Sequence, residues 1–241
     1  MPKSKRDKKI SLTKTDKKGL ALKQKIVEDI RNCVEKYKSI YVFTYRNMRN
    51  ETMKSVREEW KPSRFFIGKN RVIAIGFGRT AEEEVGEDLH KLSSCLKNQC
   101  GLLFTDCKKK EVVEWFKDYS VQEFARSGFI PKSTIKLEAG PLKQFSHAIE
   151  PYLRQLGLPT KLDKGVVTLL KDFEVCTKGK SLTPEQAKIL ELLEHKLATF
   201  KLILKAKWTK GKGFEKFKVE DDEDEEDNED EADVEMDGDD N

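Results

Sequence analysis

The sequence has no long apolar run. No segment reaches the roughly 18 consecutive apolar residues that a membrane helix needs. No apolar stretch follows the charged N-terminus, as one would in a secretory signal. Apolar residues make up 37% of the chain and charged residues another 37%, a low apolar share for a wholly folded chain. We therefore expect an intracellular protein with no membrane segment, part of whose length does not fold.

Cysteine is scarce, and its spacing argues against both disulfides and metal. The five cysteines are odd in number and form no C-x-x-C pair, which excludes a disulfide framework. A zinc site needs about four nitrogen or sulfur ligands, and the segment richest in candidates contains His90, Cys95, Cys100 and Cys107. Cys95 lies beside Leu96 on an apolar helix face and Cys100 opens an apolar strand. We interpret these cysteines as free thiols and expect no metal.

Catalytic motifs are also missing. The chain has three histidines, and His147 has Ser146 beside it. Neighbours in sequence point apart on most backbones, however, and no G-x-S-x-G elbow occurs. A nucleotide-binding P-loop at Gly68 would need another glycine where the sequence has Ser63. The sequence thus indicates a protein that is not an enzyme and has neither a cofactor nor a small-molecule substrate.

Acidic residues are concentrated at one end of the chain. The net charge is +4, but residues 220–241 contain 16 acidic residues and no basic one. The preceding 219 residues therefore hold 27 Asp and Glu against 47 Lys and Arg, a net charge of +20. A body with this surplus attracts polyanions by releasing their counterions. Nucleic acid is the favoured partner, and a generically soluble lysine-rich surface is the alternative.

A second charged segment opens the chain. Residues 3–9 read KSKRDKK, with five basic residues in seven. Such a run is typical of a nuclear localisation signal, of a flexible RNA-binding arm or of a solubilising tail. The residues of the predicted localisation signal are Lys3, Lys5, Arg6, Lys8 and Lys9.

Between these charged ends, apolar periodicity predicts alternating strands and helices. Short β-rich runs predict strands at 40–45, 64–68 and 101–105. Three- and four-residue apolar spacing predicts helices from 20 to 37, from 50 to 60, from 69 to about 78, from 82 to 97 and around 112–116. Asn50 is the expected N-cap of the second helix. We predict an α/β fold in which helices pack on a small mixed sheet.

The segment "RFFIGKNRV" places large polar groups where an apolar strand ends. We expect Gly68 to turn the chain out of the strand and Lys69, Asn70 and Arg71 to lie at a helix N-terminus. Free backbone N–H groups at that point favour a phosphate. The Asn70 amide can also bond a ribose hydroxyl or a base edge.

Five segments resemble a known family. "FTYRNMRN", "FFIGKNRV", "GLLFT", "FARSG" and "LGLPTKLDKGVVTLL" occur in this order, with similar spacing, in the ribosomal stalk-base protein family, called L-ten in bacteria and P-zero in eukaryotes. The opening "MPKSKRDKK" is similar to the start of the family's nuclear ribosome-assembly members. The resemblance covers about residues 1–218.

The resemblance implies an RNA-binding α/β domain interrupted by a second, smaller α/β insert. We expect a disordered basic arm at 1–18, the RNA-binding domain at 19–126 and 200–218, the insert at 127–199, and a disordered acidic tail at 219–241.

Local patterns fit this organisation. "STIKLEAG" is typical of a strand, and "GVVTLLKDFEVC" of a strand and its continuation. Thr183, Pro184 and Gln186 predict a capped helix start. "FKLILKAKW" then predicts a strand, and "TKGKG" a hairpin turn. That this strand returns to the first domain is implied by the resemblance.

Members of the family bind large-subunit ribosomal RNA at the stalk base, beside an L-eleven-type protein. The positions that match their contacting motifs are Arg46, Asn47, Arg49 and Asn50 after the first strand, Lys69, Asn70 and Arg71 after the second, Arg126 near the junction, and Lys14, Lys17 and Lys18 before the first helix. Alternatively, Asn50 only caps a helix and Arg126 forms an internal ion pair.

The resemblance implies a nuclear and nucleolar assembly factor that occupies stalk-base RNA on the pre-60S particle, the precursor of the large subunit. The mature stalk protein would later replace it. Residues 220–241 cannot form the apolar helices with which a working stalk protein recruits its partners. An mRNA-binding adaptor in RNA turnover and a mature ribosomal component remain as alternatives.

Overall fold

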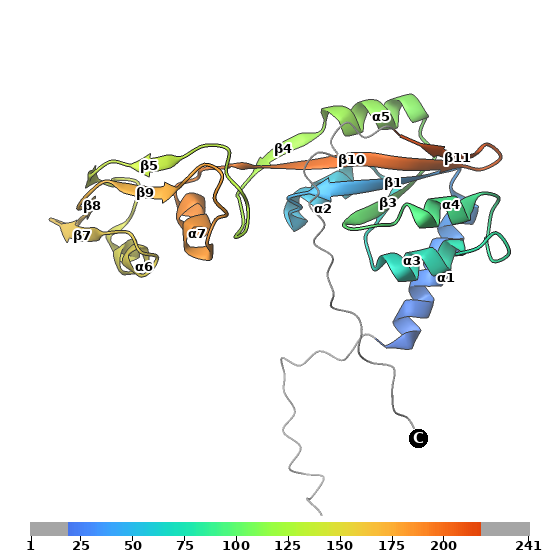
Figure 1. Ribbon diagram of the computed structural model, residues 1–241, viewed down its shortest axis with the longest axis horizontal. Helices are drawn as coiled ribbons and strands as arrows, with labels where there is room; N and C mark the ends of the chain where they lie inside the picture. The colour runs from blue at the N-terminus through green and yellow to red at the C-terminus, as the bar shows by residue number, and fades with distance from the viewer. Residues whose placement is uncertain (1–18, 218–241) are drawn as a thin grey trace, which may run out of the picture.

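The computed structural model describes residues 19–217 (Figure 1). The predicted basic arm and acidic tail lie outside the described residues, as do Lys14, Lys17, Lys18 and the five basic residues of the localisation signal. No helix among residues 19–217 is long and apolar enough to cross a membrane.

The larger part of the fold is a sheet with helices on both faces. Its strands are β1 (Ser39–Arg46), β2 (Arg64–Phe66), β3 (Cys100–Thr105), β4 (Ser120–Glu123), β10 (Ala198–Thr209) and β11 (Gly213–Lys216). Its helices are α1 (Leu20–Lys36), α2 (Asn50–Glu59), α3 (Asn70–Phe77), α4 (Leu89–Ser94) and α5 (Lys109–Asp118). The predicted α/β class is therefore confirmed.

The strand order is β11-β10-β1-β3-β2, and β4 pairs with β10. Every pair in this sheet is antiparallel, whereas the sequence predicted a mixed sheet. The physical reason is the position of β3. The strands β1 and β2 run in the same direction, but β3 returns between them and pairs with both.

Alternation along the strands sends apolar side chains to two separate cores. The helices α1, α3 and α4 cover one face, where Ile40, Val42 and Leu102 are fully buried. The helices α2 and α5 cover the other face, over Phe43 and Leu103. Figure 1 shows α5 above the sheet and α1, α3 and α4 below it.

A β-bulge makes β10 contribute to both cores. Val42 pairs with Ala206 and the next residue, Phe43, pairs with Leu204, so that Lys205 is an extra residue in the ladder. Before the bulge, Leu204 and the alternating apolar residues preceding it pack under α2 and α5. After the bulge, Ala206 and Trp208 pack on the opposite face. One inserted residue thus exchanges the faces of the strand.

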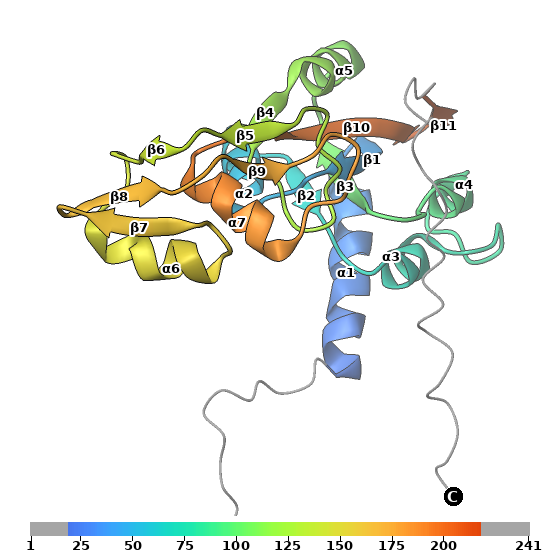
Figure 2. The ribbon, with the colours of Figure 1, turned by 60° about the vertical axis from the view of Figure 1, so that its left-hand side comes forward.

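A second lobe lies at the far end of β10 and has its own apolar core. Its elements are β5 (Ile135–Leu137), β6 (Gly140–Pro141), the 3-10 helix η2 (His147–Ile149), α6 (Glu150–Gln155), β7 (Thr160–Asp163), β8 (Val166–Leu169), β9 (Phe173–Cys176) and α7 (Pro184–Leu192). Figure 2 turns this lobe forward, with α6 beside β7 and α7 beside β9.

The antiparallel pair formed by β4 and the first residues of β10 joins the two lobes. Thr183 and Gln186 form the predicted capping box at the start of α7. The segment 165–176 is not one continued strand, since β8 pairs with β6 and β7 whereas β9 pairs with β5 in another sheet.

The helix predicted over 82–97 is wrong in extent, because only Leu89–Ser94 is helical. The Glu84 carboxylate accepts the backbone N–H groups of Asp88 and His90, each at 3.2 Å. Asp88 adopts a left-handed φ of 68°, which a continuous helix does not allow. The carboxylate that the sequence placed inside the helix therefore caps it from outside.

Gly76 allows α3 to lie close to α1. A Cβ atom at this position would lie 2.9 Å from the Ile30 Cγ2, and Ile30 is fully buried. Gly76→Ala should therefore lower the free energy of unfolding by about 1–2 kcal/mol, because overpacking of about 1–3 kcal/mol exceeds the gain of about 1 kcal/mol in helix propensity. Thermal unfolding followed by circular dichroism measures the change.

Gly68→Ala is the control, since its Cβ atom would meet nothing closer than 3.5 Å. The hypothesis of close packing is wrong if Gly76→Ala melts at or above the temperature of the unmodified protein.

Candidate nucleic-acid interface

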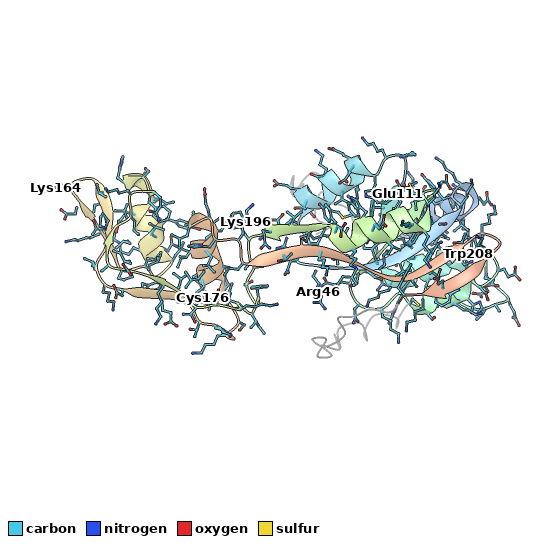
Figure 3. The ribbon with its side chains drawn as sticks, turned by 90° about the horizontal axis from the view of Figure 1, so that it is seen from above. Arg46, Glu111, Lys164, Cys176, Lys196 and Trp208 are labelled. Atoms are coloured by element: carbon cyan, nitrogen blue, oxygen red, sulfur yellow. The ribbon has the colours of Figure 1, made fainter. Side chains whose placement is uncertain are left out.

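The sheet face under α1, α3 and α4 continues past the helices and becomes basic. Beyond Val42, the same face of β1 carries Thr44 and Arg46, and before the bulge the same face of β10 carries Lys201 and Ile203. Arg46 is exposed, and Lys201 and Ile203 are half-buried. Figure 3 labels Arg46 beside β10, between the Trp208 end of the strand and the second lobe.

The pairing of β1 with β10 brings two cations together here. Arg46 is the register partner of Lys201, just as Thr44 is that of Ile203. Directly opposed residues in an antiparallel pair have Cβ atoms about 4.5–5.5 Å apart. Two positive side chains from segments more than 150 residues apart in sequence therefore lie side by side on one face.

Lys205, the bulged residue, adds a third cation. Its charge acts on the Cys100 thiol in β3, so both groups lie on this face. Burial raises the pKa of Cys100 to about 11, and the positive charge of Lys205 and a hydrogen bond with Asn70 partly oppose that rise. We refer to Arg46, Lys201 and Lys205 as the basic sheet end.

The loop that carries Lys69, Asn70 and Arg71 borders the basic sheet end. Asn70 Nδ2 donates to the Asn98 carbonyl at 2.8 Å, and its Oδ1 accepts from the Cys100 Sγ at 3.2 Å. The amide thus ties the start of α3 to the start of β3. Lys69, at the N-cap of α3, and Arg71, in its first turn, are exposed beside it.

Gly68 is not required for the turn in the way the sequence suggested. Its φ lies outside the left-handed region, and a Cβ atom would make ordinary contacts, the nearest at 3.5 Å with Phe66.

Asn47 and Arg49, predicted to bind RNA, hold the junction between the lobes. Asn47 has a left-handed φ of 53°, and its Nδ2 donates to the Thr199 carbonyl at 3.0 Å. Arg49 donates to the Phe124 carbonyl at 2.7 Å. Both bonds attach the loop after β1 to the pair of strands that leads to the second lobe. Arg126 is exposed just beyond β4, where that lobe begins.

The expected cap at Asn50 is wrong by one residue. Arg49 occupies the N-cap of α2, and Asn50 is exposed as the first helical residue. No side-chain hydrogen bond closes this helix start.

Two residues of the basic sheet end, Lys201 and Lys205, were missed in the sequence. The signal was present in "FKLILK", where alternation with period two places Lys201, Ile203 and Lys205 together on one face of a strand. What the sequence did not show was the missing helix over this part of the face.

Among residues 19–217, no cluster of three or more His, Cys, Asp or Glu side chains has the arrangement of a metal site. The five cysteines are free thiols, as predicted, with Cys33, Cys100 and Cys176 buried. The polar groups of the candidate interface are therefore donors and cations suited to an anionic partner.

Comparison with known families matches both lobes. Residues 18–121 match the model described as ribosomal protein L10, and residues 125–194 match a second model, described as the insertion domain in the 60S ribosomal protein of the same family. The chain is 43% identical over 208 residues to a protein of Dictyostelium discoideum named ribosome assembly factor mrt4, covering 86% of this chain and 93% of that relative. The chain belongs to the Mrt4 branch of the ribosomal protein L10 family.

Other relatives show the same division. A Schizosaccharomyces pombe protein, also named ribosome assembly factor mrt4, is 38% identical, with 87% of this chain and 92% of the relative covered. The large ribosomal subunit protein uL10 of Thermococcus onnurineus is 24% identical, with 71% of this chain but only 51% of the relative covered. Similarity to the Mrt4 proteins thus extends over nearly their whole length.

In this Mrt4 family member, we expect the basic sheet end to supply RNA affinity. The triple variant Arg46→Gln, Lys201→Gln, Lys205→Gln should lower the slope of log affinity against log salt by about 2–3, because each phosphate contact contributes close to one. Fluorescence anisotropy of a labelled RNA over a salt series measures that slope.

The matched control is Lys54→Gln, Arg57→Gln, Lys117→Gln, which removes the same charges from exposed positions on α2 and α5. Its slope should stay near that of the unmodified chain. Equal losses in the two variants would mean that total charge, not this face, determines binding.

Proposed function

We propose that the protein is a non-catalytic assembly factor of the large ribosomal subunit that binds stalk-base ribosomal RNA. The observation that carries the proposal is the uncovered basic sheet end, bordered by the Lys69–Arg71 loop on the same face. Cations on an open face bind the phosphate backbone, and adjoining polar loops fix its register. The names of the Mrt4 relatives support a role in ribosome assembly.

The mechanism we propose is occupancy. As a member of the L10 family, the chain would hold the RNA site that the mature stalk protein later occupies, and leave when that protein arrives. The similarity supports this role over that of a mature ribosomal component, because it covers 92–93% of the two Mrt4 relatives but 51% of the archaeal uL10 protein.

The proposed partners and location follow from this role. The chain would act on pre-60S particles in the nucleus and nucleolus, next to the L-eleven-type protein of the stalk base. The run of five basic residues in 3–9 supports nuclear import. A direct role as an mRNA-binding adaptor would instead place it with cytoplasmic mRNA.

A competition experiment tests the placeholder role. The full chain is first bound to a labelled stalk-base fragment of large-subunit RNA, and the mature stalk protein of the same organism is then added. We expect the stalk protein to displace the chain, so that each RNA molecule carries one protein or the other in native gel electrophoresis. A ternary complex of both proteins on one RNA would contradict a shared site.

The RNA partner is tested separately. Ultraviolet crosslinking of the tagged protein in cells, followed by sequencing of the bound RNA, should yield large-subunit precursor RNA with crosslinks at the stalk base. Enrichment of mRNA without ribosomal RNA would favour the adaptor.

A further inference from the structure

A concavity between α3 and α4 lies next to the Lys69–Arg71 loop and is not explained by packing. Its volume is about 370 Å³, within the range of roughly 300–1,000 Å³ that is usual for small-ligand sites. The residues that line it are Asn70, Arg71, Ala74, Arg79, His90, Ser93, Ser94 and Leu96. Figures 1 and 2 both show α3 and α4 side by side.

Two arginines give the concavity its donors. Arg71 comes from the first turn of α3, and Arg79 follows Gly78, the left-handed residue that ends this helix. Both side chains are exposed. A guanidinium group presents a planar fork of N–H donors that matches phosphate oxygens, so two forks on one concavity suit a phosphodiester.

The neighbouring hydroxyls offer acceptors, because their own protons are already used. Ser93 Oγ donates to the Gly78 carbonyl at 2.9 Å, and Ser94 Oγ donates to the Lys91 carbonyl at 2.7 Å. A hydroxyl oxygen that donates its proton keeps lone pairs that can accept from a ligand. The bond from Ser93 also fixes the backbone immediately before Arg79.

His90 and Glu84 hold the α4 side of the concavity. His90 Nδ1 bonds Glu84 Oε2 at 2.7 Å, and the bonds to His90 hold the pKa of the Glu84 carboxyl below its usual value. Because a carboxylate only accepts, the Nδ1 proton faces Glu84, and Nε2 is the ring atom left for a ligand. Glu84 is absent from the lining of the concavity, as are Glu82 and Glu83.

We propose that this concavity binds one ribonucleotide of the RNA, with its phosphate on Arg71 and Arg79 and its ribose 2′-hydroxyl toward the Ser94 Oγ. Forked donors beside hydroxyl acceptors match a phosphate beside a 2′-hydroxyl, the group by which proteins distinguish RNA from DNA. Since the concavity adjoins Asn70, one strand of RNA can run from the basic sheet end into it. The inference rests on the proposed RNA-binding function and adds a specific subsite to it.

Arg79→Gln is the most informative variant, because Arg79 lies outside every motif singled out in the sequence. It should weaken binding of a stalk-base RNA fragment about tenfold and lower the salt slope by about 1, as expected for a good arginine contact. Arg79→Lys should recover the slope but only part of the affinity, since the charge returns without the fork. The matched control is Arg57→Gln, an exposed arginine on α2, which should change affinity less than twofold.

A small probe tests the concavity without the ribosomal RNA. Adenosine 3′,5′-bisphosphate, added at millimolar concentration to the ¹⁵N-labelled full chain, should shift the amide signals of residues 70–79 and 90–96. These shifts should be lost in Arg79→Gln and weakened with the 2′-deoxy analogue or in Ser94→Ala. Equal shifts with the ribose and deoxyribose probes would overturn the assignment of the 2′-hydroxyl contact.

The two proposals fail in different ways. If Arg79→Gln binds stalk-base RNA as tightly as the unmodified chain and the probe shifts no amide around the concavity, the subsite is wrong while the proposed function stands. If the unmodified chain does not prefer stalk-base RNA over unrelated RNA of equal length, the proposed function is wrong. Amide shifts that still vanish in Arg79→Gln would then retain the concavity as a nucleotide site.

Discussion

The pairing of β1 with β10, with its single extra residue at Lys205, is the constraint on which the rest of the fold depends. Without the bulge, every even-numbered residue of β10 would face the same side of the sheet. With it, Leu204 packs under α2 and α5 whereas Trp208 packs against the opposite core. The same strand can therefore close two cores and also extend to the second lobe.

The bulge also determines where positive charge is exposed. Before it, Lys201 lies on the face that α1, α3 and α4 cover farther along the sheet, opposite Arg46. Because the helices do not extend over this end, the lysine stems can rest on the sheet while their charges reach solvent. The functional surface thus follows from the mismatch in length between the sheet and its helices.

Much of the fold was predictable from local patterns. The apolar alternation of β1, β3 and β10 and the capping box of α7 each depend on neighbours in sequence, and the structure confirms them. The helix over 82–97 was wrong because Glu84 closes a turn with Asp88 and His90, a tertiary arrangement that its apolar spacing does not reveal.

The candidate site was predictable only in part. The loop residues Lys69 and Arg71 are exposed beside the basic sheet end, and that placement was visible from the polar run after a strand. Asn47, Arg49 and Asn70 belong to the same polar runs, yet their side chains bond carbonyl groups of distant segments. A polar residue in a loop can serve the ligand or the backbone, and only the register of remote strands decides between them. Lys201 and Lys205 were missed for the same reason.

Lysine acylation of the free and RNA-bound protein, quantified by mass spectrometry, tests the central claim that RNA lies on this face. The account predicts that a stalk-base RNA fragment protects Lys69, Lys201 and Lys205 from modification, while Lys54, Lys110 and Lys117 on α2 and α5 keep their reactivity. Protection of the α2 and α5 lysines with unchanged reactivity at Lys69 and Lys205 would contradict it.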